Sequence, residues 1–297
     1  ITEQELAQLT EQLSQKQEAA ERNATAFSAL QSQLENAQLT TGQQAIQLDA
    51  LTSALAKSRE EQESIEQRLQ ELAARAPGTY DHSLQVASLV EAGVTAIGGD
   101  AALAYVGALY HDIGKMRKPE YFVENQSGAN PHDDLRPNIS YLIIVGHVKD
   151  GLEMAAASGL PKSLREFISS HHGTQVVRWF YVKARDAASE DEEVEEASFR
   201  YPGPRPRSKE AAVLMLADAC ESASRAAVEL PSGKIESIVR DLSKERLLDG
   251  QFDECNLTLR ELHDIEDAII GRLRSIRHQR LAYPDDQDDS VLPDSSS

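Results

Sequence analysis

Positive charge is scarce in this sequence, which has 30 Lys and Arg residues against 49 Asp and Glu residues. The formal net charge of -19 argues against sequence-independent binding to nucleic acids, because such binding depends on basic side chains that neutralise phosphates. We therefore expect no nucleic-acid partner. A small phosphorylated substrate is compatible with this composition, since bound metal cations can dominate the charge of a site.

Cysteines and long apolar segments are also scarce. Cys220 and Cys255 are too few for the disulfide framework of a small secreted protein, so we expect them to be reduced. No apolar run approaches the roughly 18 residues that span a bilayer, and no secretory signal is recognisable. These features predict a cytoplasmic location and no membrane segment in this chain. Because the chain begins with Ile1 rather than Met, a fragment of a membrane-anchored protein stays an open alternative.

Aromatic residues make up only 5% of the chain, whereas alanine and leucine, which favour helices, are plentiful. No alternation of apolar and polar residues is long enough to predict a β-strand. The sequence therefore predicts an all-α fold. One helix is expected to begin at a capping Thr79 and to end near Ile97. Further helices are expected at about 101–116, 137–158, 161–172, 174–186, 208–229, 231–247 and 258–281.

Residues 1–75 carry an uninterrupted heptad pattern that is typical of a coiled coil. With Leu6 at position a, apolar residues return at a and d without a change of register as far as Leu72. Polar residues at some of these positions, such as Asn23, can fix the register and the number of strands. We interpret the segment as a helix that forms a homodimer, since a lone amphipathic helix cannot bury its apolar stripe. The alternative is a hairpin that folds back at Gly42.

Helix-breaking residues and changes of composition divide the rest of the chain. Ala76-Pro77-Gly78 ends the coiled coil, and residues 77–283 are expected to form one helical domain. Within that domain, the glutamate-rich stretch 187–197 is interpreted as a solvated acidic loop. Residues 284–297 are acidic, rich in serine and without apolar periodicity, so we expect them to form a disordered tail.

Histidines gather in one part of the predicted domain. Six of the eight lie within residues 82–172, whereas histidines used only for packing would be scattered. A single histidine on an apolar face is more often a core residue than a ligand, but a group of this size beside an aspartate favours metal binding. Imidazole and carboxylate together suit divalent manganese, iron or zinc. The group consists of His82, His111, His132, His147, His171 and His172, and Asp112 directly follows His111.

Two of these motifs have a local geometry that suits a metal centre. Adjacent residues of a helix point about 100° apart, so His111 could hold one ion while the two oxygens of Asp112 bridge to a second. His171 and His172 precede Gly173, a residue type that commonly ends a helix. Leaving the helix there would direct both rings to one ion. The motifs together predict a two-metal site that binds a phosphate and activates water.

The series of motifs resembles the HD-domain phosphohydrolases. In particular, it resembles the cytosolic HD domain of the seven-transmembrane HD family, the PgpH-type cyclic di-AMP phosphodiesterases. The similarity covers about residues 77–284, with the motifs in the family's order. The matching strings include Pro77-Gly78-Thr79-Tyr80, Tyr110–Lys115, Glu124-Asn125-Gln126, His171–Thr174 and Met215–Asp218.

The resemblance implies an HD-domain helical bundle with two divalent manganese or iron ions. It implies that one ion is held by His82, His111, Asp112 and Asp218. It implies that the other is held by His147, His171 and His172, with Asp112 as the bridge. His132 does not belong to this ligand set, and we expect it to have a structural role.

The resemblance also implies hydrolysis of cyclic di-AMP to the linear dinucleotide by a metal-bridging water, with Asp112 and Lys115 as catalytic residues. Lys115 would neutralise phosphate oxygens or protonate the leaving oxygen. Two alternatives stay open. The site could act on another nucleotide phosphate, including cyclic di-GMP, although the Gly-Tyr-Pro signature of that subgroup is absent. The chain could also be a non-catalytic dimeric module that senses nucleotides. It departs from the family in having a coiled coil where membrane helices are expected.

Overall fold

A computed structural model describes residues 2–189, 193–226 and 232–281. Over these residues the chain is helical, and the isolated bridge between Val176 and Arg200 is their one β-type pairing. The predicted all-α fold is confirmed. A search of the described helices finds none with the length and apolar character of a membrane span. The chain divides into two compact units, residues 1–63 and 64–297.

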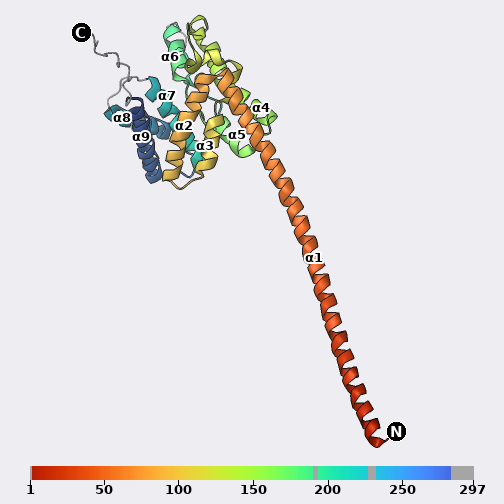
Figure 1. Cartoon of the computed structure of the whole chain (residues 1–297). Helices are drawn as coiled ribbons and strands as arrows, with labels where there is room; N and C mark the ends of the chain where they lie inside the picture. The colour runs from red at the N-terminus through yellow and green to blue at the C-terminus, as the bar shows by residue number, and fades with distance from the viewer. Residues whose placement is uncertain (1, 190–192, 227–231, 282–297) are drawn as a thin grey trace, which may run out of the picture. The chain divides into compact units, whose positions relative to one another are not determined.

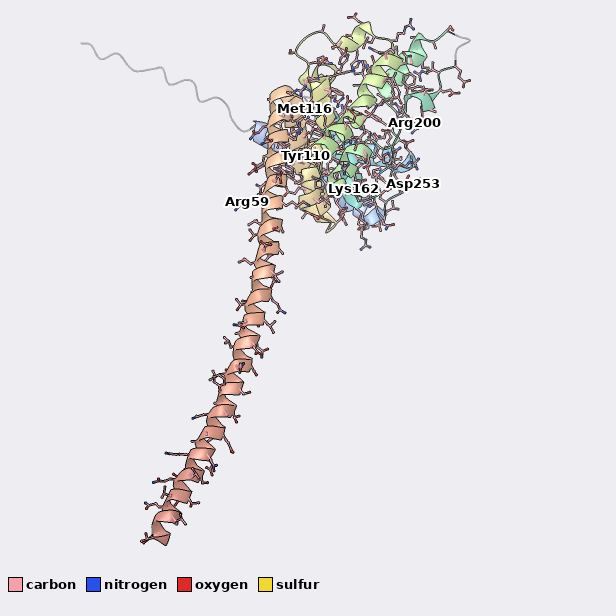
Figure 2. The ribbon with its side chains drawn as sticks, turned by 90° about the vertical axis from the view of Figure 1, so that its right-hand side faces the viewer. Arg59, Tyr110, Met116, Lys162, Arg200 and Asp253 are labelled. Carbon is pink, nitrogen blue, oxygen red and sulfur yellow. The ribbon has the colours of Figure 1, made fainter. Side chains whose placement is uncertain are left out.

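The first unit consists of most of α1 (Glu3–Arg75), which runs through Gly42 without a break. The hairpin alternative is therefore wrong. A glycine inside a helix costs about 1 kcal/mol relative to alanine, which does not end a helix whose flanking residues favour it. Figure 2 shows side chains projecting from all sides of this helix, and the leucines at positions a and d of this unit are exposed.

The second unit begins at Ser64, within α1. Figure 1 labels the α-helices α2 to α9 that belong to this unit. Leu72 and Ala76 are fully buried in its core, and Ile65 and Leu69 pack against that core. The hydroxyl of Tyr110 donates to the Ile65 carbonyl at 2.5 Å. The last turns of the segment predicted as a coiled coil therefore pack into the helical domain.

The centre of this domain is α2 (Pro77–Ala96), which packs against α3 (Ala101–Tyr110), α7 (Lys209–Ala226) and α9 (Leu259–Leu281). Its buried face carries Val86, Leu89 and Val90. The other α-helices are α4 (Pro137–Ala157), α5 (Lys162–Ser170), α6 (Arg178–Ala187) and α8 (Ser232–Leu248). Short 3₁₀ helices are η1 (Ile113–Arg117), η2 (Pro119–Tyr121), η3 (Val123–Asn125), η4 (Pro131–Asp134) and η5 (Glu196–Phe199).

The start of α2 differs from the prediction. The helix begins at Pro77, a residue type suited to the first helical position, and the expected cap by Thr79 is wrong. Thr79 is buried, and its N–H donates to Oδ1 of Asn125 at 3.1 Å. A side chain distant in sequence therefore caps this helix, which local sequence patterns do not reveal.

Two other predicted helices are shorter than expected. The one predicted at 101–116 ends at Tyr110, and η1 follows after two residues. The one predicted at 174–186 begins at Arg178, because the preceding backbone pairs with the end of η5 and the residues after it. The Val177 N–H donates to the Phe199 carbonyl at 2.8 Å. In the acidic loop predicted at 187–197, residues 190–192 lie outside the described residues. The last two residues of that loop belong to η5. The predicted tail also lies outside the described residues.

Candidate metal centre

Five segments bring the predicted ligands together. Each segment supplies one ligand or an adjacent pair, and the ligand atoms form two groups that could each hold an ion. We call the first the His82 group, which consists of His82 in α2, His111 after α3 and Asp218 in α7. We call the second the His147 group, which consists of Asp112 before η1, His147 in α4, and His171 and His172 after α5.

Asp112 lies between the two groups, with one carboxylate oxygen towards each. Its Oδ2 is 3.2 Å from Nε2 of His111 and 3.6 Å from Nε2 of His82. Its Oδ1 is 3.2 Å from Nε2 of His147 and 3.6 Å from Nε2 of His171. Each oxygen of this carboxylate therefore faces a different group.

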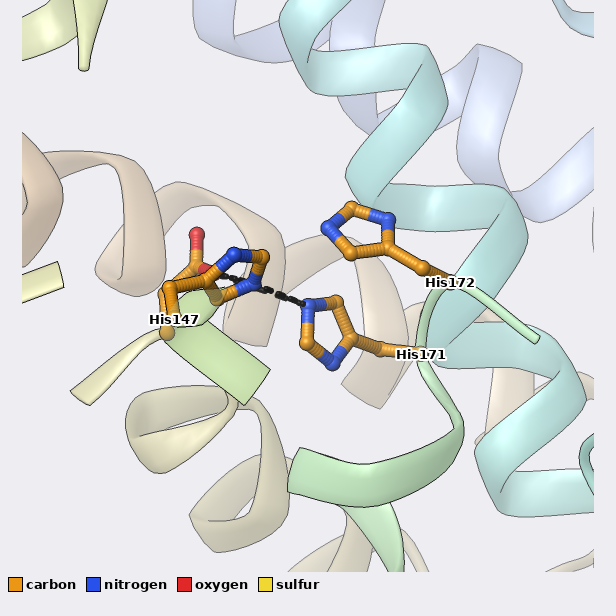
Figure 3. A group of neighbouring side chains, drawn as sticks. His147, His171 and His172 are labelled. Atoms are coloured by element: carbon orange, nitrogen blue, oxygen red, sulfur yellow. Dashed lines mark hydrogen bonds and ion pairs between the residues drawn. The ribbon is translucent and has the colours of Figure 1, made fainter. Parts of the chain in front are cut away.

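Asp218 completes the first group and faces the second. Its Oδ1 is 3.0 Å from Nε2 of His82, and its Oδ2 is 3.9 Å from Nδ1 of His172. The His172 ring stacks on the ring of Tyr201, with centroids 4.2 Å apart and planes inclined by 25°. Asp218 is 8% exposed, which agrees with a buried, partnered carboxylate. Figure 3 shows the rings of His147, His171 and His172 converging.

Three ligand rings are held by the backbone of their own segment. Nδ1 of His111 donates to a carbonyl at 2.7 Å, Nδ1 of His147 at 2.6 Å and Nδ1 of His171 at 2.9 Å, in each case to the residue three positions earlier. A carbonyl only accepts, so Nδ1 carries a proton, and in the neutral ring the lone pair lies on Nε2. Such a second hydrogen bond fixes the tautomer and orientation of a metal-binding histidine.

Buried polar atoms without a hydrogen-bond partner indicate whether these residues fit metal ions. Nε2 of His111 and Oδ1 of Asp112 are buried and have no hydrogen-bond partner among the described residues. Buried polar atoms normally have a partner. Ligands about 2.1 Å from a common ion and separated by about 90–120° lie about 3.0–3.6 Å apart. The distances from the two Asp112 oxygens to the nearest imidazole nitrogens of both groups, 3.2–3.6 Å, fall in this range, so the residues fit divalent cations.

The electrostatics of the His147 group match the ligand states that metals require. Burial lowers the pKa of His171 and of His172, which favours neutral imidazoles. Burial alone would raise the pKa of the Asp112 carboxyl, but His111 and Lys115 lower it well below its usual range. Neutral imidazole and ionised carboxylate are the forms that bind a cation. At His82, burial alone would lower the pKa, but the carboxylates of Asp218 and Glu221 raise it to about 9.

Lys115 is held between two carboxylates. Its Nζ lies 2.7 Å from Oδ2 of Asp112 and 2.7 Å from Oε1 of Glu124 in η3. Burial alone would lower the pKa of this ammonium, but the two carboxylates raise it above its usual range, so Lys115 is charged. No role for Glu124 was predicted from the sequence. Glu124 is also hydrogen-bonded to the Thr79 hydroxyl, which ties η3 to α2.

His132 lies outside both groups, as expected from the family resemblance. Its Nε2 donates to the Tyr121 carbonyl at 2.9 Å, and its ring packs against the rings of Tyr121 and Phe180. It therefore holds η4 against η2 and α6. Tyr201 and Glu221, which contact His172 and His82, were not identified from the sequence.

Known proteins are similar to the helical domain that carries these residues. The model of the HD domain matches residues 79–223. Cyclic-di-AMP phosphodiesterase PgpH of Listeria monocytogenes is 44% identical over 221 residues, which are 74% of this chain and 30% of the relative. PgpH of Bacillus subtilis is 43% identical over 218 residues, which are 73% of this chain and 30% of the relative. The chain thus spans about a third of the length of these curated relatives.

Solved structures extend the similarity to three dimensions. The HD domain of L. monocytogenes phosphodiesterase PgpH is 43% identical, with a TM-score of 0.68, and the match covers 71% of this chain and 99% of that one. The same domain in complex with cyclic di-AMP matches with a TM-score of 0.69 at 43% identity, over 73% of this chain and 99% of that one. The chain therefore belongs to the HD-domain family, and its HD domain is similar to that of PgpH.

Proposed function

We propose that the helical domain hydrolyses cyclic di-AMP to the linear dinucleotide. The observation that carries this proposal is the placement of Asp112, whose two oxygens face two separate ligand groups. Supporting it, the relatives are cyclic di-AMP phosphodiesterases, and a similar HD domain was solved in complex with cyclic di-AMP. The free thiols of Cys220 and Cys255 support a cytoplasmic location for this activity.

The two ligand groups would hold two divalent ions, which we propose to be manganese or iron because imidazole and carboxylate suit these metals. Bound ions of this kind clamp a phosphate and lower the pKa of a shared water. Asp112 would fix the two positions relative to each other. Lys115, which Asp112 and Glu124 keep charged, would neutralise the negative charge that develops on the phosphate oxygens.

An activity assay tests this proposal. Manganese-loaded protein is incubated with cyclic di-AMP, cyclic di-GMP and linear nucleotides, and products are separated by chromatography. We expect the linear dinucleotide from cyclic di-AMP, formed at least about tenfold faster than the product of cyclic di-GMP. Faster cleavage of another nucleotide would replace the proposed substrate. Absence of any hydrolysis with two ions bound per chain would favour a non-catalytic module.

We also propose that α1 forms a homodimeric coiled coil through residues 1–63. The apolar residues at a and d are more than half exposed along this unit, including Phe27, Leu30 and Leu34. Water-exposed apolar side chains at heptad spacing are what a second helix would cover. The polar positions of the seam would set its register.

Introducing charge into this seam should weaken the dimer. We expect the double variant Leu30→Lys, Leu34→Lys to shift the dimer dissociation constant by about 100-fold or more, because two ammonium groups per chain would face each other across the seam. Analytical ultracentrifugation measures the shift. The variant Ser28→Lys, Ser32→Lys adds the same charge away from the seam and should change the constant much less. Equal constants for both variants would contradict the proposed dimer.

A further inference from the structure

One ligand histidine is held differently from the three whose Nδ1 donates to the backbone. Nδ1 of His82 lies 2.5 Å from Oε2 of Glu221, a residue of α7 that is 3% exposed. A carboxylate accepts the Nδ1 proton, which leaves Nε2 to face Asp218 at 3.0 Å. Glu221 and Asp218 are three residues apart in α7, so one helix face presents both carboxylates to the same ring.

The ion pair of Glu221 with Arg225 does not account for its burial. Oε1 of Glu221 is 3.3 Å from Nε of Arg225, whose side chain is 35% exposed. A pair that solvent reaches on one side is weak, whereas burying a carboxylate is costly. The short contact with His82 is the stronger interaction, and carboxylate–histidine–metal arrangements of this kind orient the ring and raise its basicity.

Glu221 also makes the two ligand groups electrostatically unequal. The His82 group contains the carboxylate of Asp218 and contacts that of Glu221, whereas the His147 group has three imidazoles and one carboxylate, Asp112, which also faces the His82 group. Two cations lie nearby, but Arg225 beside Glu221 is partly exposed, and Lys115 beside Asp112 is itself paired with Glu124, so neither cancels the two carboxylates. A divalent cation is therefore attracted more strongly to the His82 group.

We propose that Glu221 is a positioning residue that fixes Nε2 of His82 for metal binding and makes the His82 group the tighter of the two metal positions. The first ion then binds at this group, and the His147 group fills second. This inference rests on the proposed two-metal function and adds an order of loading and a residue that sets it.

Calorimetric titration of the metal-free full chain with Mn²⁺ tests the inference. We expect two binding steps, of which His172→Ala removes the weaker. Glu221→Gln keeps the shape of the side chain but removes its charge, and it should weaken the tighter step by about 10- to 100-fold. Excess Mn²⁺ should then restore kcat. Glu266→Gln is the matched control, because Glu266 is buried and paired with Arg240 and belongs to neither ligand group.

Several outcomes would overturn the inference. The inference fails if Glu221→Gln leaves the Mn²⁺ affinity of both binding steps unchanged, or weakens only the weaker step. It also fails if His172→Ala removes the tighter step. An equal weakening in Glu266→Gln would show a general effect of removing a buried charge. Circular dichroism checks folding, and if Glu221→Gln does not fold, Glu221→Asp provides the same titration with the charge kept but withdrawn from His82. The proposed function fails separately, through absence of hydrolysis with both steps intact.

Discussion

Asp112→Ala should abolish metal binding at both positions and reduce hydrolysis of cyclic di-AMP by about 10³-fold or more. The reason is that both groups depend on this one carboxylate, with Oδ2 facing His111 and Oδ1 facing His147, each at 3.2 Å. Removing any other ligand leaves one group intact, whereas this change removes a ligand from both. Metal content after desalting and the rate of product formation measure the two effects.

Two further variants make the result specific to Asp112. Asp81→Ala removes an exposed aspartate that is also adjacent to a ligand histidine, and it should keep both metals and the activity. Asp112→Asn keeps the volume of the side chain but leaves only one oxygen acceptor, so we expect it to lose the bridge while the fold is retained. Full occupancy of two ions in Asp112→Ala would refute the bridging role.

The sequence predicts contiguous features of this protein well. His111 and Asp112 are adjacent, and Gly173 after His172 has the φ of +52° that is typical of a glycine after a helix, although α5 itself ends at Ser170. Such signals depend on neighbours in the chain. The periodicity of apolar residues is also a local signal, and it predicts the α-helices correctly except for the residues at which some of them begin or end.

Features that arise from distant contacts were harder to predict. Asp218 was assigned only through the family resemblance, and Glu221 was not assigned, although their spacing of three residues in a helix was a usable signal. The domain boundary shows the same limit. Leu69 and Leu72 continue the heptad pattern, but they pack on their own domain, because an apolar stripe does not specify which surface covers it.

Gly114→Ala should damage the metal centre without touching a ligand. A Cβ at Gly114 would lie 1.9 Å from the His147 carbonyl oxygen and 2.5 Å from the Gly151 nitrogen, and both are backbone atoms of α4 that cannot rotate away. We expect η1 and α4 to separate, at a cost of about 3 kcal/mol in the free energy of unfolding. Asp112, just before η1, would then no longer reach His147.

The expected consequence is selective. The His147 group should lose its ion while the His82 group keeps its own, and hydrolysis should fall by about 100-fold, since displacements near 1 Å have effects of this size. Gly146→Ala is the matched control, because it lies next to His147 in α4 and a Cβ there meets nothing within 4 Å. That variant should be stabilised by about 0.5–1 kcal/mol, as expected for alanine inside a helix. Thermal unfolding and metal content distinguish the two glycine variants. A Gly114→Ala protein with unchanged stability and two bound ions would show that close packing of η1 on α4 does not hold Asp112 in place.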